Sequence, residues 1–248
     1  MGDSRIYKGT ASSLVKWVSH EETYGPHVMR LFFQKIASAS RILDLGAGKG
    51  RDLLLAREAF PDASLHAVEC ASDNISALQG LNIDAQLLNI ETQPLPFDAE
   101  SLDIVMANQV LEHTKELFWI CHEVSRVLKV GGHFIVGVPN VASFHNRIGL
   151  LFGKHPTQAK SFSAHVRCFS KNDFLSFFEE TFPRGYSLSM FLGSQFYPFP
   201  AEISRFLSGV FPNLAFCLFF LLRKDKEYSD SIIKYPVDAR LETNFKTE

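Results

Sequence analysis

Cysteine is scarce in this chain and never falls in a pattern that holds a metal or a disulfide framework. The 248 residues contain four cysteines, Cys70, Cys121, Cys168 and Cys217, which are far apart, without a CxxC pair or a histidine at ligand spacing. Zinc sites and disulfide scaffolds need closely spaced or paired cysteines. We therefore expect reduced thiols, a cytoplasmic protein and no bound metal.

Long apolar runs and an excess of charge of one sign are also missing. The longest apolar run, residues 214–222, is too short for a membrane-spanning helix, and the first residues lack the apolar core of a signal peptide. The net charge of −2 gives no reason to expect a nucleic-acid partner. We expect no transmembrane segment, a small-molecule partner, and a monomer or homodimer.

The stretch RILDLGAGKGRDLLLA, residues 41–56, carries three glycines at alternate positions. A triphosphate-binding loop needs Ser or Thr after its lysine, but Gly50 follows Lys49, so that class is excluded. A dinucleotide-binding fold is less well supported, because its GxGxxG motif needs a third glycine where this chain has Arg51. Glu69 ends the next apolar run, where a carboxylate can accept hydrogen bonds from ribose hydroxyls. These residues predict a nucleoside-containing ligand and leave NAD open.

Short apolar runs alternate with helical patterns between residues 41 and 139. This alternation predicts a parallel sheet covered on both faces. Farther along, helices are expected at 144–153, 171–182 and 201–211, and strands at 186–193 and 214–224. In the first part, strands are expected at 41–46, 64–69, 84–89, 102–108 and 133–139, and helices at 51–60, 74–81 and 115–132.

The domain organisation follows from these patterns. Residues 1–224 are expected to form one domain, with a helical cap at 1–40, a cofactor-binding core at 41–139 and a substrate-side insertion or lid at 140–185. Residues 225–248 are charged and lack sustained periodicity, so we expect a mobile tail or an oligomer contact.

Four stretches in order, ILDLGAGKG, HAVE, LPFDAESLDIVMANQVLEH and EVSRVLKVGGHFIVGVPN, carry a family resemblance. Together they resemble the class I S-adenosylmethionine-dependent methyltransferases, in the small-molecule subgroup of ubiquinone and menaquinone methyltransferase-like enzymes (type 11). The resemblance covers residues 41–140. It implies a Rossmann-like, doubly wound sheet of about seven strands, mostly parallel with an antiparallel last strand, and helices on both faces. The implied cofactor is S-adenosyl-L-methionine, and the product is S-adenosyl-L-homocysteine.

The resemblance also implies which residues face that cofactor. The family usually has an aspartate at the end of the third strand, where this chain has Asn89, whose amide oxygen can still accept a bond from the adenine amino group. The implied set is Asp44, Gly46, Ala47, Gly48 and Gly50 for the methionine part, Glu69 for the ribose, Cys70, Asn89 and Ile90 for the adenine, and Asn108 and Gln109 beside the methionine and the sulfonium.

Candidate residues for catalysis and acceptor binding follow the fourth and fifth strands. His113, in LEHT, is the first candidate base, although such a Glu-His pair can instead only shape the pocket. His165, in SAHVRCFS, is the second candidate base, and it forms a second candidate site with Arg167, which is expected to bind the acceptor; the alternative is a strand edge with solvated charges. His145 and Arg147 are further acceptor-side candidates.

Acidic residues are absent between Glu123 and Asp173, an interval that holds seven lysines and arginines. Local positive charge can attract an anionic ligand, so we expect an acceptor with phosphate or carboxylate; a solvated basic surface is the alternative. The expected reaction is methyl transfer to oxygen or nitrogen of a small molecule or of a glycan or natural-product intermediate. The alternatives are an RNA or protein methyltransferase, and a regulatory protein that binds the cofactor without catalysis.

Overall fold

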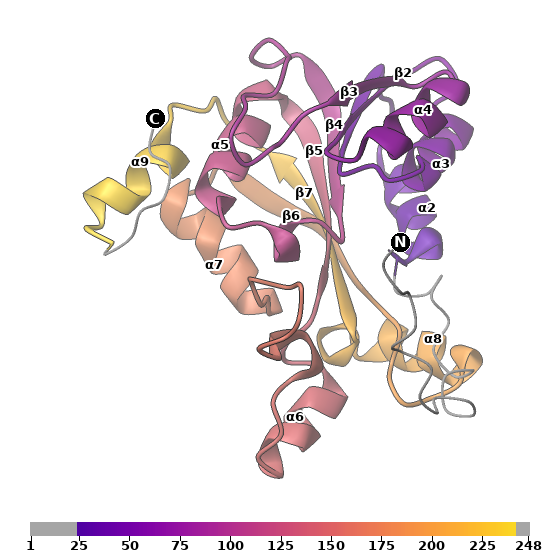
Figure 1. The fold of residues 1–248 in the computed structure, drawn as a ribbon, viewed down its shortest axis with the longest axis vertical. Coiled ribbons are helices and arrows are strands. Elements are labelled where there is room, and N and C mark those ends of the chain that lie inside the picture. Colours follow the sequence, from indigo (N-terminus) through magenta and orange to yellow (C-terminus); the bar gives the residue numbers. More distant parts are fainter. Residues whose placement is uncertain (1–23, 242–248) are drawn as a thin grey trace, which may run out of the picture.

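A seven-stranded sheet organises the molecule in the computed structural model, which describes residues 24–241 (Figure 1). The strand order is β3-β2-β1-β4-β5-β7-β6, and only β7 runs antiparallel to its neighbours. This confirms the expected mostly parallel sheet with an antiparallel last strand. The strands are β1 (Arg41–Leu45), β2 (Ser64–Glu69), β3 (Asp84–Leu87), β4 (Leu102–Asn108), β5 (Leu128–Pro139), β6 (Tyr186–Ser194) and β7 (Cys217–Lys224).

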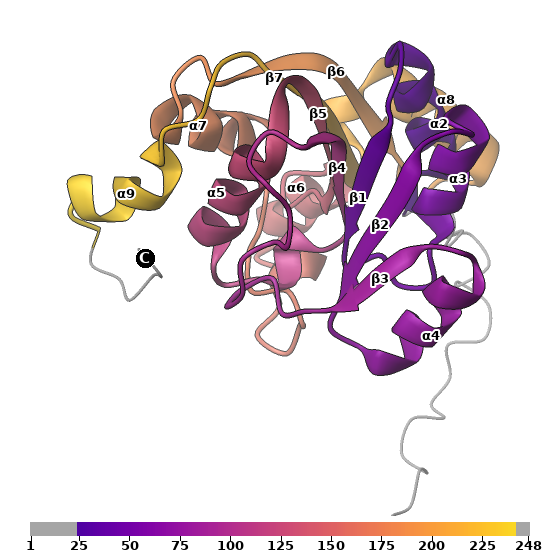
Figure 2. The same cartoon turned by 90° about the horizontal axis from the view of Figure 1, so that it is seen from above.

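Helices cover both faces of this sheet (Figure 2). The central strands are apolar along most of their length because both of their faces are buried, as in other parallel sheets. One face is covered by α2 (Pro26–Lys35), α3 (Arg51–Ala59) and α4 (Ser72–Gly80), and the other by α5 (Leu117–Val127), α7 (Lys171–Thr181) and α9 (Ser231–Asp238). The part of the expected N-terminal cap before residue 24 lies outside the described residues.

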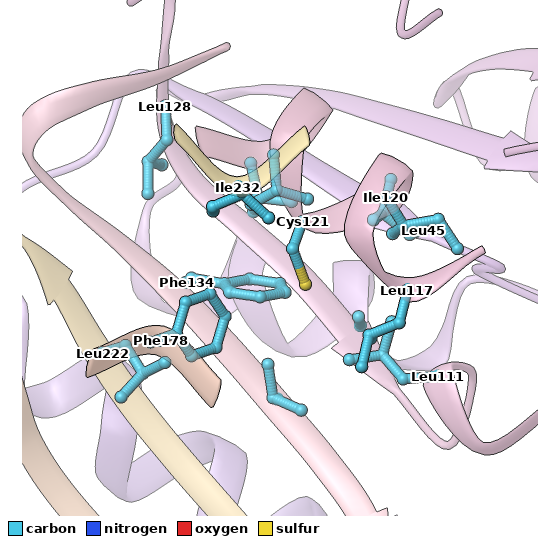
Figure 3. Packing of buried hydrophobic residues seen from close by; sticks show 14 of the residues in the cluster. Leu45, Leu111, Leu117, Ile120, Cys121, Leu128, Phe134, Phe178, Leu222 and Ile232 are labelled. Carbon is cyan, nitrogen blue, oxygen red and sulfur yellow. The ribbon is translucent and has the colours of Figure 1, made fainter. Parts of the chain in front are cut away.

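Helix α9 lies in the segment where we expected a tail without regular structure, and for residues 231–238 that expectation was wrong. Ile232 is fully buried in the same cluster as Cys121 of α5 and Phe178 of α7 (Figure 3). The helix is only eight residues long and carries Pro236 in its interior, so its sequence is a weak helix signal by itself. The segment is helical because α5 and α7 offer an apolar surface for its buried face.

The boundary between α5 and β5 also differs from the sequence prediction. We expected a helix through Gly132, but α5 ends at Val127 and β5 begins at Leu128. Gly131 has a φ of +84°, and a Cβ on Gly132 would lie 3.0 Å from the carbonyl oxygen of Asp103. The glycine pair therefore forms an irregular, closely packed start of a strand, where the pairing with β4 shifts register, and does not terminate a helix.

Two excursions leave the carboxyl edge of the sheet, where the parallel strands end (Figure 1). After β5 come α6 (Phe144–Leu151) and the short helix η3 (Thr157–Ala159); after β6 come α8 (Ala201–Val210) and η4 (Pro212–Leu214). Asn140 ties them together at the sheet: its buried side chain donates to the carbonyl oxygens of Asn213 and Ala215, and its amide oxygen accepts from the N–H of Ala142. Among the described residues, no helix is both long and apolar enough to cross a membrane.

Candidate functional site

A cavity of about 330 Å³ opens at the carboxyl edge, beside the adjacent ends of β1 and β4. Strand connections leave β1 and β4 in opposite directions, and in open α/β sheets ligands bind at such a switch point. The cavity wall comes from the turns that follow four parallel strands. It is formed by Gly46, Val68, Glu69, Cys70, Leu88, Asn89, Ile90, Glu91, Gln109, Val110, His113 and Thr114.

The glycine turn after β1 needs its glycines. Gly46, Gly48 and Gly50 have φ values of +63°, +55° and +82°, in the left-handed region that other residues adopt at a cost. A Cβ on Gly46 would come within 2.8 Å of the side chain of Val110, which lines the same cavity. The turn therefore brings bare backbone to the cavity wall.

Glu69 connects this turn to the next one. Its Oε2 accepts a hydrogen bond from the N–H of Gly48 at 2.8 Å, and its Oε1 accepts from the N–H groups of Cys70 and Ala71 at 2.9 and 3.2 Å. The side chain is buried, yet it forms part of the cavity wall. A carboxylate accepts about four hydrogen bonds, so these three backbone donors leave capacity for a ligand hydroxyl.

The predicted cofactor residues divide into two groups by their position. Asp44, Ala47, Gly48, Gly50 and Asn108 lie near the cavity without forming its wall. The others, Gly46, Glu69, Cys70, Asn89, Ile90 and Gln109, all line it.

Asn108 and Asp44 have other partners. The Nδ2 of Asn108 donates to Asp52 Oδ2 at 2.7 Å and to the carbonyl oxygen of Tyr24 at 3.0 Å, so this side chain links β4 to α3 and to the residues before α2. Burial, with Asp52 as the next contribution, raises the pKa of Asp44 well above its usual value. Asn108 therefore links β4 to α3, the helix that follows the glycine turn.

Three polar side chains meet at the rim of the cavity: Glu112 and His113 from the short helix η2 (Leu111–His113), and His165 from the connection before α7. The rings of His113 and His165 are 4.8 Å apart between centroids, in an edge-to-face arrangement. Glu112 is 1% exposed, and neither of its carboxylate oxygens has a hydrogen-bond partner among the described residues. Its Oε1 lies 3.9 Å from His113 Nε2.

Burial decides where protons reside in this cluster. It raises the pKa of Glu112 to about 8. Burial, and secondarily the nearby His113, lowers the pKa of His165, whose Nδ1 is buried without a hydrogen-bond partner among the described residues. At neutral pH the carboxyl group is protonated and the His165 ring is neutral, so this ring can accept a proton.

Arg167 fastens the two chain segments that carry the cluster. Its Nε donates to the carbonyl oxygen of Thr114 at 3.1 Å, and its Nη2 donates to that of Lys115. The backbone N–H groups of Val166 and Arg167 donate to the carbonyl oxygen of Glu112 at 2.8 and 3.1 Å. These contacts give Arg167 a positioning role that the sequence analysis, which assigned it to acceptor binding, did not foresee.

The other acceptor-side candidates lie apart from this cluster. The ring of His145 packs against Tyr197 and Phe216, with centroids 5.1 and 5.4 Å away, and burial lowers its pKa. The exposed Arg147 donates from Nε to the carbonyl oxygen of Ala142 at 2.6 Å. The structure therefore does not bring His145 and Arg147 together with His113 and His165.

The cluster has the donor types of a catalytic zinc site, which the sequence analysis did not detect because Glu112 and His165 are far apart in the chain. The three ligand atoms lie within 4.8 Å of one another. Two ligands of a tetrahedral zinc ion, each about 2.1 Å from the metal, are only about 3.4 Å apart. The 3.9 Å between Glu112 Oε1 and His113 Nε2 is slightly wider than this separation, so the ligand atoms would have to draw closer to hold an ion.

Part of the chain is similar to known methyltransferases. Residues 43–136 match the family model described as a methyltransferase domain. The chain is 32% identical over 109 residues to a malonyl-[acyl-carrier protein] O-methyltransferase of Legionella pneumophila, a match that covers 42% of this chain and 37% of the relative. It is 28% identical over 131 residues to ribosomal RNA small subunit methyltransferase G of Chlorobium phaeobacteroides, covering 52% of this chain and 54% of the relative.

A solved structure shares the fold at low sequence identity. The geranyl diphosphate C-methyltransferase of Streptomyces coelicolor, determined with Mg²⁺, geranyl diphosphate and S-adenosyl-L-homocysteine, superimposes with a TM-score of 0.53 at 15% identity. The match covers 80% of this chain and 78% of that one. The chain spans well under two thirds of the length of both curated relatives, so its similarity to them is that of one domain.

Proposed function

The chain carries a class I S-adenosylmethionine-dependent methyltransferase domain, and we propose that it transfers the methyl group to oxygen or nitrogen of a small molecule or of a glycan or natural-product intermediate. One observation carries the proposal. A single cavity has Glu69, at the end of β2, in one part of its wall and His113, beside the buried Glu112 and His165, in another. Cofactor and acceptor groups would therefore meet within one cavity.

The proposed cofactor contacts come from residues of that wall. Glu69 accepts hydrogen bonds from the ribose hydroxyls with the capacity that its backbone donors leave. The backbone of Gly46 lies against the methionine part, and Asn89 and Ile90 border the adenine. The sulfonium is already an activated methyl donor, so the protein has to align the acceptor and exclude water.

A proton acceptor completes the proposed chemistry when the acceptor atom is a hydroxyl. The oxygen attacks the methyl carbon in line as the S–CH₃ bond breaks, and the hydroxyl proton passes to a ring nitrogen of His165, which burial keeps neutral, or of His113. The products are the methylated acceptor and S-adenosyl-L-homocysteine. Glu112 has a pKa of about 8 and is already protonated near neutral pH, so it cannot accept that proton.

The acceptor is proposed to be anionic. Exposed Arg147, Lys154 and Lys160 lie on the connection after β5, and that connection carries no acidic residue. Two other basic residues of the acid-free interval, Arg126 and Lys129, are neutralised in ion pairs with Glu123 and Asp103. The name of the Legionella relative, a malonyl-[acyl-carrier protein] O-methyltransferase, favours an oxygen acceptor.

RNA methylation is the second candidate, favoured by the similarity to the Chlorobium ribosomal RNA methyltransferase. The net charge of −2 speaks against it, because RNA-binding domains usually carry a basic face. Incubation with methyl-labelled S-adenosylmethionine distinguishes the two. Label in the RNA fraction supports the second candidate, and label in small anionic molecules supports the first.

Calorimetry tests the cofactor site directly. The folded wild-type protein is expected to bind S-adenosylmethionine and S-adenosylhomocysteine, and Glu69→Ala to bind them about 1–3 kcal/mol more weakly because the ribose loses its acceptor. Glu58→Ala, which removes an exposed carboxylate from α3, is the matched control. A folded wild-type protein that binds neither compound, or that binds NAD instead, contradicts the proposal. Unchanged affinity of Glu69→Ala contradicts the placement of the ribose.

A further inference from the structure

Helix α8 is amphipathic, but its polar face is buried and its apolar face is exposed to solvent. Its buried side chains are Ser204 and Ser208, each 2% exposed, whereas Ile203, Phe206 and Val210 are 49%, 70% and 52% exposed. A surface helix of a globular protein normally turns its apolar stripe toward the core. The exposed apolar stripe of α8 therefore indicates a partner outside the described chain.

Helix α6 shows the same reversal. Its buried side chain is Asn146, which donates to the carbonyl oxygen of Asn140 and to Gln158 Oε1. Leu151 and Phe152, at its carboxyl end, are 83% and 76% exposed. Isolated exposed apolar side chains are normal, but two consecutive ones at the end of a helix with a polar buried side chain are not.

The two helices belong to one surface of the molecule. Both follow strands that end at the carboxyl edge, and both lie toward the lower end of Figure 1, where α6 extends away from the sheet. The ring of Phe144, the first residue of α6, is 5.6 Å from that of Phe196, in the segment that leads into α8. We call the exposed apolar side chains of α6, Phe162 and those of α8 the α6/α8 surface; Phe162 is 86% exposed.

Positive charge lies around the α6 part of this surface, whereas α8 carries one exposed acidic residue, Glu202, and one exposed basic residue, Arg205. Arg147, Lys154 and Lys160 are exposed around α6, and no acidic residue occurs between Glu123 and Asp173. Apolar residues that enter the acyl boundary, bordered by lysine and arginine, are the pattern of helices that lie in the interface of anionic membranes. We propose that the α6/α8 surface docks on an anionic phospholipid bilayer, with the carboxyl edge of the sheet toward the lipid.

The shape favours a bilayer over a protein partner. Protein interfaces are close-packed patches with a central buried core. Here the exposed apolar side chains lie on α6, on the connection that follows it and on α8, and α6 protrudes from the molecule (Figure 1). A bilayer accepts separate protruding groups because it deforms around each of them. This docking does not depend on the proposed reaction, since neither helix contributes to the cavity wall.

Vesicle co-sedimentation tests the proposal without any methyl-transfer readout. The full chain is expected to sediment with vesicles of phosphatidylcholine and phosphatidylglycerol, and much less with phosphatidylcholine alone. The pair Phe152→Ser and Phe206→Ser should lower the apparent partition coefficient at least about tenfold. Lys154→Glu with Lys160→Glu should lower it about tenfold or more on the anionic vesicles, and added salt should weaken wild-type binding.

Matched controls carry the same changes away from this surface. Val130→Ser with Val237→Ser removes exposed apolar side chains from β5 and α9, and Lys35→Glu with Lys234→Glu reverses exposed charges on α2 and α9. These controls should bind vesicles like the wild type, and melting curves should show every variant folded. Lack of vesicle binding by the wild type overturns the proposal, as does binding that the Phe152 and Phe206 changes leave intact. A wild-type dimer that these changes convert to a monomer identifies a second copy as the occupant and also overturns it.

Discussion

The imidazole rings of His113 and His165 lie edge to face with their centroids 4.8 Å apart, although one ring follows β4 and the other precedes α7. The contact joins the cofactor side of the cavity to the excursion that would cover the acceptor. The nearby His113 adds to burial in lowering the pKa of His165, so the His165 ring is neutral at neutral pH.

Replacement of His165 should lower turnover without loss of the cofactor. In His165→Asn, kcat for the true acceptor is expected to fall about 10²–10⁴-fold, while the affinity for S-adenosylmethionine stays constant. Because burial lowers the pKa of His165, its neutral form persists below pH 6.5, and the acid limb of the wild-type kcat profile should lie below that pH. His155→Asn, on the same excursion but exposed, is the control. Turnover within a few fold of the wild type in both variants rules out a proton-transfer role.

Glu112 should make stability depend on pH with a defined sign. Its folded-state pKa of about 8 lies above the usual 4.5, so between these values the unfolded chain releases a proton that the folded chain keeps. The contribution of this group to the free energy of unfolding is largest below about pH 4.5. It declines between about pH 4.5 and pH 8, by an amount on the order of 4 kcal/mol. Glu112→Gln lacks this loss. Denaturant unfolding near pH 5 and near pH 9 should show the variant gaining relative to the wild type at the higher pH; parallel stability curves would be the contrary result.

Gly46 and Gly48 form a matched pair for the glycine turn. Alanine at either site must adopt a left-handed φ, which should lower the free energy of unfolding by about 1–2 kcal/mol. At Gly46 the new Cβ also meets Val110 at 2.8 Å, whereas at Gly48 it meets nothing within 4 Å. Gly46→Ala should therefore be about 1–3 kcal/mol less stable than Gly48→Ala in denaturant unfolding. Val110→Ala should recover part of the difference, and equal stabilities of the two alanine variants would refute the close approach.

Arg167 should act on catalysis through position. Arg167→Met leaves the carbonyl groups of Thr114 and Lys115 without this donor, so stability should fall by about 1–3 kcal/mol. Because the segment of His165 then keeps only its backbone hydrogen bonds to η2, kcat should fall while cofactor affinity changes little. Arg57→Met removes a guanidinium that likewise donates to carbonyl groups, of Leu81 and Asn82, far from the cluster, and should leave kcat unchanged. A rise in KM for an anionic acceptor at constant kcat would instead assign Arg167 to acceptor binding.

Local patterns in the sequence were sufficient for the core of the fold. The apolar run of β1, the glycines after it and the acid that ends β2 each depend on neighbours in the chain, so these strands and the position of Glu69 followed from them, whereas the antiparallel last strand was implied by the family resemblance. The α5–β5 boundary did not, because a glycine pair is equally compatible with a helix end and with a strand irregularity. Packing of Gly132 against the backbone of β4 decides between the two.

Side-chain direction was the part of the site that the sequence could not supply. Asn108 and Gln109 are consecutive, yet Gln109 lines the cavity and Asn108 turns to Asp52 of α3, because β4 ends at Asn108 and the backbone of Gln109 turns away with a φ of +60°. Glu112 was missed for a related reason. Only the tertiary contact with the segment of His165 reveals that its carboxylate is buried beside the two histidines.

Asn140 has a consequence for protein engineering. Its single buried amide crosslinks the root of the α6 excursion to the root of the α8 excursion, and its own N–H donates to the carbonyl oxygen of Phe216 at 2.7 Å. The two excursions therefore share one set of hydrogen bonds and form one exchangeable unit. A chimera that takes the α6 excursion from a relative while keeping the native α8 excursion would break that set. Both segments have to be transplanted together for the acceptor side to fold around a new substrate.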